Sequence, residues 1–421
     1  MPNEQEYRQL VSTVSLQFGA DVAKILEQAF RIAYSKHRCD ICMHSGERFE
    51  GVTIGADFVY ALEFEAAVAT VHEMLSRIKV VTSNSAPVTP VVDEARFNPN
   101  FRNVCKNWSP HDKALLSCWA DGFVDRDRKF VKEFQTTFNA CFWELYLFAC
   151  LKHLELRVDF KHTRPDFVID NFLDKFCIEA AIASNAKDQP SEWERKISDI
   201  KNLKRKRIVD EATIRLANTL VAKHQKFVSE YHELPHVKGK PFVLAIAPFE
   251  QPHFEVQNDQ AMRRVLYAYD RPVCRGKRLI RHEYIRSIRK KSGTEISLGF
   301  FLDQRMREIS AVIFSNTATA GKVRALSDDP SPNIWFRTLR FNKNGQKPLV
   351  WGCAKPDYYE SLLDGLHVFH NPNARYPLPW DLFNKQGVSQ HTYVTGHPWP
   401  PFKTTHGALI QRTVVTMRIK D

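Results

Sequence analysis

Residues 164–169 read RPDFVI, and residues 176–182 read FCIEAAI. Both are short apolar runs typical of buried strands, with an acid at the start of the first run and another inside the second. Charge in a buried strand is costly unless it is paired or bound to a metal. Asp166 and Glu179 therefore predict a hard-oxygen site for Mg²⁺, with the two carboxylates converging at one edge of a sheet. The alternative is that Glu179 points to solvent from an edge strand.

The segments around these strands alternate between helix and strand. Apolar periodicity predicts helices over 128–154 and 211–230, and apolar runs predict strands within 156–170, 176–182, 241–248 and 309–315. This order predicts an α/β fold whose core is a mixed sheet flanked by helices.

Composition and periodicity divide the chain into four parts. Helical periodicity in 5–36 and 57–80 predicts a small helical N-terminal domain over 1–80, and the Pro- and Ser-containing stretch that follows predicts a linker over 81–110. The α/β core is expected over 111–325, with a basic insertion. Residues 326–421, rich in Pro, Asn, His and Trp, predict a loop-rich C-terminal region.

Two further ionisable side chains interrupt apolar helical segments. Glu144 lies in the run ACFWELYLF at residues 140–148, where a helix could turn it toward the sheet edge or leave it at the surface beside an arginine. Lys223 stands between Leu220 and Phe227 in an apolar stripe that begins at Leu216. It either faces the acids or lays its methylene stem along the apolar surface.

This arrangement resembles the PD-(D/E)xK nuclease superfamily, whose fold is that of the restriction endonucleases. The resemblance matches Glu144 to the family's helical acid, Pro165 and Asp166 to its Pro-Asp, and Glu179 to its strand glutamate. It implies that Asp166, Glu179 and the main-chain carbonyl of Ala180 bind Mg²⁺, with Mn²⁺ as a substitute, and that Glu144 is an auxiliary acid.

The sequence departs from the family at the lysine, because Ala181 stands in that position. Phosphodiester cleavage needs a cation to orient water and to offset charge that develops on the phosphate. Some relatives carry the lysine on the following helix, so the resemblance implies that Lys223 replaces it. Lys226, Lys187 and Lys161 remain weaker alternatives.

The function that the resemblance implies is a Mg²⁺-dependent DNA endonuclease in bacterial restriction or antiphage defence. The alternative is a nuclease-like protein that lost catalysis with its lysine and binds nucleic acid or assembles complexes. A third option is an RNA-cleaving toxin. A protein partner or a second copy of the chain is expected to dock through the N-terminal domain.

The net charge of +12 favours a polyanionic partner, DNA or RNA. Residues 1–80 carry a net charge of −3, so the excess belongs to the rest of the chain. Basic runs lie at 201–207 and 275–291, and either could be only a solvated face. If the second run is helical, several of its arginines share one stripe. The side chains expected to contact nucleic acid are Arg215, Arg278, Arg281, Arg286, Arg289 and Lys290.

The remaining signals narrow the class of protein. Nine cysteines, an odd number spread over a long chain, fit reduced thiols, and the Cys39–Cys42 pair lacks a second pair, so zinc is not expected. The spacing of the C-terminal histidines matches no metal-ligand motif, which favours surface or loop-pinning roles; these are His367, His370, His391, His397 and His406. The sequence shows no secretory signal, membrane span or phosphate-binding loop, so a cytoplasmic protein without membrane contact is expected.

Overall fold

The computed structural model describes residues 41–44, 48–54, 57–59, 87–171, 174–275, 278–343, 347–397 and 399–417. The chain divides into two compact units, residues 1–84 and 85–421. In the first unit, β1 (Ile41–His44), β2 (Arg48–Ile54) and β3 (Asp57–Val59) form an antiparallel sheet. The helix predicted from residue 57 is therefore wrong over 57–59, because these residues pair with β2. The helix predicted over 5–36 lies outside the described residues.

The second unit begins with helices where a linker was predicted. Asn98 caps α4 (Pro99–Asn107), and Ser109 and Asp112 form a capping box at the start of α5 (Pro110–Ala120). Each helix begins with a proline, which suits the first helical turn because its missing N–H has no partner there anyway. The linker prediction is therefore wrong over 99–110, since the polar and Pro-containing residues cap helices.

The helix predicted over 128–154 is split into α6 (Phe130–Thr136) and α7 (Asn139–His153). The break falls at Phe138, whose φ of 48° is incompatible with a continuous right-handed helix. From Cys141 to Leu151, every residue of α7 is buried except Glu144, which is partly exposed. This helix is thus a core element with one charged side chain at an opening.

The centre of the unit is a seven-stranded mixed sheet, which confirms the predicted α/β class. Its order is β16-β15-β14-β11-β6-β5-β4, with parallel pairs at β5–β6, β6–β11 and β14–β15. The strands are β4 (Phe167–Asp170), β5 (Lys175–Ser184), β6 (Phe242–Phe249), β11 (Ala311–Phe314), β14 (Leu366–His370), β15 (Val388–His391) and β16 (Phe402–Lys403). Of the strands predicted within 156–170, only β4 forms. Before it, Val158 makes a single isolated bridge with Ile169.

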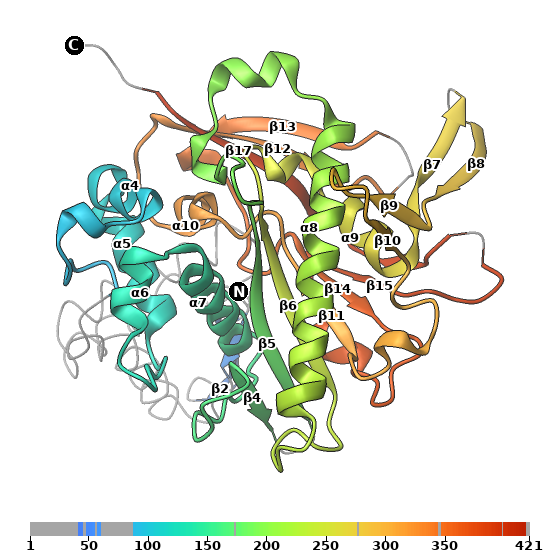
Figure 1. Ribbon diagram of the computed structural model, residues 1–421. Coiled ribbons are helices and arrows are strands. Elements are labelled where there is room, and N and C mark those ends of the chain that lie inside the picture. The colour runs from blue at the N-terminus through green and yellow to red at the C-terminus, as the bar shows by residue number, and fades with distance from the viewer. Residues whose placement is uncertain are drawn as a thin grey trace, which may run out of the picture. The chain divides into compact units, whose positions relative to one another are not determined.

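Helices cover both faces of this sheet (Figure 1). One apolar core packs α7 and its neighbours against the sheet, and the other packs α8 (Arg205–Lys226) and α9 (Gln260–Tyr267) against the opposite face. A π-helical turn, Phe227–Tyr231, extends α8. Side chains of β5 alternate between the two cores, as Ile178 and Cys177 illustrate.

The C-terminal region is more regular than its composition predicts. Residues 326–421 supply β14, β15 and β16 to the central sheet, together with a second sheet of order β13-β12-β17. That sheet consists of β12 (Ile334–Arg340), β13 (Leu349–Ala354) and β17 (Leu409–Thr416), and α10 (Ala320–Leu326) precedes it. Most residues of 326–421 nevertheless lie in turns and irregular segments between these strands, so the region is loop-rich but contains strands that its composition did not indicate.

The basic segment 275–291 is not helical. It forms parts of a hairpin, β7 (Tyr269–Arg275) with β8 (Arg278–Tyr284), followed by β9 (Ser287–Arg289), which pairs with β10 (Glu295–Ser297). Short helical turns complete the unit: Glu94–Arg96, Glu192–Glu194, Ile197–Asn202, Phe254–Gln257, Gln304–Met306, Lys355–Asp357 and Trp380–Phe383.

Candidate active site

Asp166 directly precedes β4, and Glu179 lies beside it on β5. The antiparallel register pairs Phe167 with Ile178, so the next step places Asp166 beside Glu179. The Ala180 N–H donates a hydrogen bond of 2.7 Å to Oδ2 of Asp166. Glu179 is 4% exposed. The two acids that the sequence singles out are thus brought together, and Glu179 does not point freely into solvent.

A main-chain oxygen also lies beside these acids. In an extended strand, the N–H and C=O of one residue point to the same side. The Ala180 carbonyl therefore faces the side on which its N–H meets Asp166, and no described backbone N–H outside the strand ladders donates to it.

Three donors from one helical segment converge on Glu179. Its Oε1 lies 2.7 Å from the Nζ of Lys223, 3.3 Å from the Nζ of Lys226 and 3.2 Å from the hydroxyl of Tyr231. The side chains of Lys223 and Lys226 are 25% and 39% exposed, so both ammonium groups reach the surface. The stripe of Leu216, Leu220 and Phe227 is buried as the sequence predicts.

The sheet geometry accounts for lysines on α8 rather than on β5. Cys177 and Ala181 pack in the core on the α8 face, and Glu179 lies between them on the same side of β5. A side chain at position 181 and one on α8 would therefore approach Glu179 from the same face of the sheet. Lys223 and Lys226 of α8 both contact Glu179 on this face.

Glu144 completes a group of three carboxylates. Burial and then the nearby Asp166 raise the pKa of Glu144 to about 8, with Glu179 adding to the effect and Arg126 opposing it. Burial and then Glu179 raise the pKa of Asp166 to about 6. Like charges and partial desolvation thus disfavour full ionisation of this group, and a divalent cation would relieve both effects.

Arg126 is a site residue that sequence reasoning missed. Its guanidinium donates to the main-chain oxygens of Asp166, at 3.1 Å, and of Pro165 and His162. It thereby holds the segment that leads into β4, and its charge acts on both Glu144 and Asp166. It lies in a loop before α6, where no local pattern distinguishes it from neighbouring charged residues.

The side chains predicted to contact nucleic acid are scattered. Arg215 does not point freely outward, because its guanidinium donates to the carbonyls of Ser184, at 2.7 Å, and Asn185, at 3.2 Å, at the end of β5. Arg278 and Arg281 are exposed on β8, and Arg281 pairs with Glu283 at 3.1 Å. The single helical stripe expected for these arginines is wrong. Exposed or partly exposed positions farther along are Arg286, Arg289 and Lys290.

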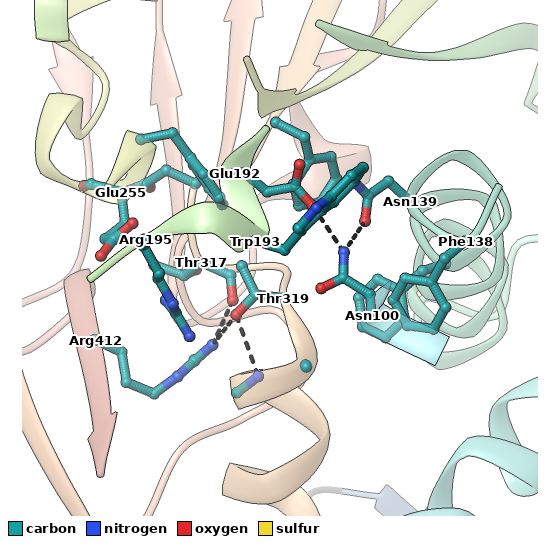
Figure 2. A pocket seen from close by; sticks show the side chains of 16 residues that line it. Asn100, Phe138, Asn139, Glu192, Trp193, Arg195, Glu255, Thr317, Thr319 and Arg412 are labelled. Carbon is teal, nitrogen blue, oxygen red and sulfur yellow. Dashed lines mark hydrogen bonds between the residues drawn. The ribbon is translucent and has the colours of Figure 1, made fainter. Parts of the chain in front are cut away.

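A separate pocket lies where parallel strands of the central sheet end. Phe249, the last residue of β6, and Thr317, just after β11, both line it. Figure 2 shows Arg195 near Arg412, and Trp193 also lines the pocket. Phe142 of α7 lies on its wall, two residues before Glu144. The three carboxylates of the candidate site are not among its described lining residues.

A second group of side chains that could bind a metal lies elsewhere in the fold. Within the part of the chain that the structure describes, one group of three His, Cys, Asp or Glu residues has ligand atoms all within 4.8 Å of one another: Asp259, His367 and His391. Glu144, Asp166 and Glu179 are spread more widely than this. The prediction of surface or loop-pinning roles is wrong for His367, His370 and His391, which lie on strands and are 7%, 7% and 3% exposed. His397 and His406 lie outside the strands at partly exposed and exposed positions.

No family model, curated protein or solved structure matches this chain. None of the described helices is both long enough and apolar enough to cross a membrane.

Proposed function

We propose that this protein is a Mg²⁺-dependent nuclease of the PD-(D/E)xK type that cleaves DNA. One observation carries the proposal: Asp166, Glu179 and the Ala180 backbone converge at a sheet edge that two lysine ammonium groups also reach. The chain order of an acid on α7, Pro-Asp before β4 and glutamate on β5 agrees with the order that the resemblance implies.

The donor set fits magnesium. Mg²⁺ prefers hard oxygen ligands and usually keeps several waters, so two carboxylates and one carbonyl are enough protein ligands. Asp166, Glu179 and the Ala180 carbonyl would hold the ion, which would polarise the phosphate and lower the pKa of a bound water. Glu179 offers Oε2 for this purpose, because the three hydrogen bonds described for its carboxylate all go to Oε1.

The protein's own side chains would supply the remaining chemistry. Lys223 and Lys226 place positive charge beside Glu179, where it can offset charge that develops on a phosphate in the transition state. Tyr231 fixes the glutamate by a hydrogen bond of 3.2 Å. Glu144, with its pKa raised to about 8, holds a proton near neutral pH and can exchange it with a leaving oxygen or a water.

Nucleic acid as the substrate is supported by the charge distribution. The chain carries a net charge of +12, and the exposed Arg278 and Arg281 lie on a hairpin of the same unit. Trp193 is 38% exposed beside the exposed Arg195 at the pocket of Figure 2, and such pairs can stack on bases and contact phosphates. These features favour a polyanion with accessible bases.

The test is cleavage of supercoiled and linear DNA in Mg²⁺, in Mn²⁺ and in EDTA. Wild type should cleave only with a divalent ion, and Asp166→Asn and Glu179→Gln should each lose at least about 10³-fold in rate. The double variant K223M/K226M should lose about 10²–10³-fold. Lys206→Met is the matched control, because Lys206 lies on the same helix with its side chain 84% exposed. Cleavage that persists in Asp166→Asn and Glu179→Gln would overturn the proposal.

The arrangement also favours a second function, an inactive nuclease-like protein that binds nucleic acid. Lys223, Lys226 and Tyr231 already satisfy Oε1 of Glu179, and Ala181 stands where the family has lysine. DNA binding that falls steeply with salt, without cleavage in Mg²⁺ or Mn²⁺, would select this function. RNA cleavage in the same assay would instead change the substrate.

A further inference from the structure

A second cluster of metal-ligating side chains lies far along the chain from the carboxylate site. Asp259 precedes α9, His367 lies on β14, and His391 is the last residue of β15. Nδ1 of His367 lies 3.1 Å from Nε2 of His391, and a carboxylate oxygen of Asp259 lies within 4.8 Å of both rings' ligand atoms. None of these residues belongs to the proposed nuclease site.

The sheet register brings the two histidines together. The parallel strands β14 and β15 pair His367 with Ser389 and Phe369 with His391, so the two imidazoles stand two positions apart on one face. This is the face that carries α9, because Phe369 packs in the same core as Leu266 and Val265. Asp259 is the N-cap residue of α9, and its carboxylate lies within 4.8 Å of the ligand nitrogens of both histidines.

The separation of the ligand atoms suits a small tetrahedral ion. Zn²⁺ binds imidazole nitrogen at about 2.0–2.1 Å, which places two such ligands roughly 3.3 Å apart in a tetrahedral site. The observed 3.1 Å between the histidine nitrogens is close to this value. Burial lowers the pKa of both imidazoles, which keeps them in the neutral form that ligates metals.

Arg263 holds the third ligand. Its guanidinium contacts both carboxylate oxygens of Asp259, with Nε 3.1 Å from Oδ2 and Nη2 3.2 Å from Oδ1. Partners of this kind orient a ligating carboxylate while leaving lone pairs on each oxygen. The ring centroids of Phe314 and Phe369 lie 6.2 Å and 6.0 Å from that of His367, so the cluster also has apolar neighbours.

We propose that Asp259, His367 and His391 form a binding site for a divalent transition metal of the zinc class. Two imidazoles and one carboxylate select such ions over Mg²⁺, which prefers oxygen ligands alone. The site ties the start of α9 to β14 and β15, three elements that otherwise meet only by packing and hydrogen bonds. Three protein ligands leave one position for water, as in catalytic zinc sites.

The test is a metal titration of the full chain after dialysis against EDTA. Co²⁺ should give visible ligand-field absorption that saturates at about one ion per chain, as expected for a single site of this ligand class, and that Zn²⁺ abolishes. Zn²⁺ at about 100 times its Kd should raise Tm by roughly 5 °C. His367→Ala and His391→Ala should lose the cobalt absorption, and the isosteric Asp259→Asn should weaken binding at least about tenfold.

His370→Ala is the matched control. His370 lies on the same strand, is equally buried at 7% exposed, and pairs with Gln390 at 2.9 Å, but it stands outside the cluster. This variant, like Glu179→Gln of the nuclease site, should keep the cobalt absorption, so failure of one site is distinguishable from failure of the other. Wild type without cobalt absorption, or absorption unchanged in folded Asp259→Asn and His391→Ala, would overturn the proposal.

Discussion

Glu360 and Glu179 are both buried, and each contacts two cations and a tyrosine hydroxyl. The exposure of their partners and the charges around them differ. Glu360 contacts Lys322, Arg412 and the hydroxyl of Tyr358. The side chains of Glu360 and Lys322 are completely buried, and that of Arg412 is 2% exposed. Although burial opposes it, Arg412 and Lys322 hold the pKa of Glu360 below its ordinary value. This glutamate is ionised, fully paired and closed to solvent.

Glu179 also contacts two cations and a tyrosine, but its partners reach the surface. Lys223 and Lys226 are partly exposed, and two further carboxylates, Asp166 and Glu144, act on the same region. Burial first, and a neighbouring carboxylate second, raise the pKa of both of those acids. Burial and pairing are thus common to Glu360 and Glu179. The neighbouring carboxylates and the partly exposed lysines are what distinguish Glu179.

Removing a cation from the buried group of Glu360, Lys322 and Arg412 should lower the free energy of unfolding the most. Lys322→Met leaves Glu360 buried with one cation fewer, and breaking a buried pair in this way costs about 3–5 kcal/mol. Urea denaturation should show this loss as a lower midpoint. Lys223→Met should cost less than about 1 kcal/mol of unfolding free energy, because the ion pair that it removes is partly exposed to water in wild type. Equal losses for the two variants would remove the distinction between the clusters.

The contrast also shows what sequence can reveal. Asp166, Glu179, Glu144 and Lys223 each interrupt or border an apolar run, and a charge in such a place is visible without a structure. Glu360 gives no such signal, because it lies in a polar segment. Its partner Arg412 is on β17, far along the chain. Its burial depends on contacts between residues far apart in the chain.

The same reason explains the other differences. The central sheet from β5 to β11 was predictable because its strands are continuous apolar runs. The cluster of His367, His391 and Asp259 was not, because its spacing in sequence reflects the register of two strands and the end of a distant helix. The hairpin of β7 and β8 was missed because basic residues dominate it and its faces are mostly exposed.

The pH dependence of stability tests the carboxylates around Glu179, because Glu144 has a raised pKa there. Because the pKa of Glu144 is about 8 in the folded chain and ordinarily 4.5, the folded state keeps a proton that the unfolded chain releases between these values. The free energy of unfolding should therefore fall as pH rises from 4.5 to 8, by roughly 2–4 kcal/mol from this group. Glu144→Gln should flatten that fall in urea midpoints measured across the range.

Glu250 sets the control for this measurement. Burial raises its pKa to about 7, so wild type and Glu144→Gln should share a residual slope below that pH. The wild-type curve should be the steeper of the two from pH 4.5 to 8, and above pH 7, where Glu250 has titrated, the remaining fall of the wild-type curve should come from Glu144. Mg²⁺ should stabilise wild type there by replacing the proton. Parallel curves up to pH 8 would mean that neither burial nor the neighbouring carboxylates raise the pKa of Glu144.

The smallest expected effect lies on the exposed hairpin, where charge acts without burial. Arg278→Ala with Arg281→Ala removes two exposed cations of β8, and each phosphate that is no longer neutralised should lower the slope of log affinity against log salt by about 1. The free energy of unfolding should change by less than about 0.5 kcal/mol. Lys129→Ala, a similarly exposed cation paired with Asp127, is the control and should leave DNA binding unchanged. If the double variant keeps the wild-type salt slope, the hairpin is a solvated face and DNA approaches the acids from elsewhere.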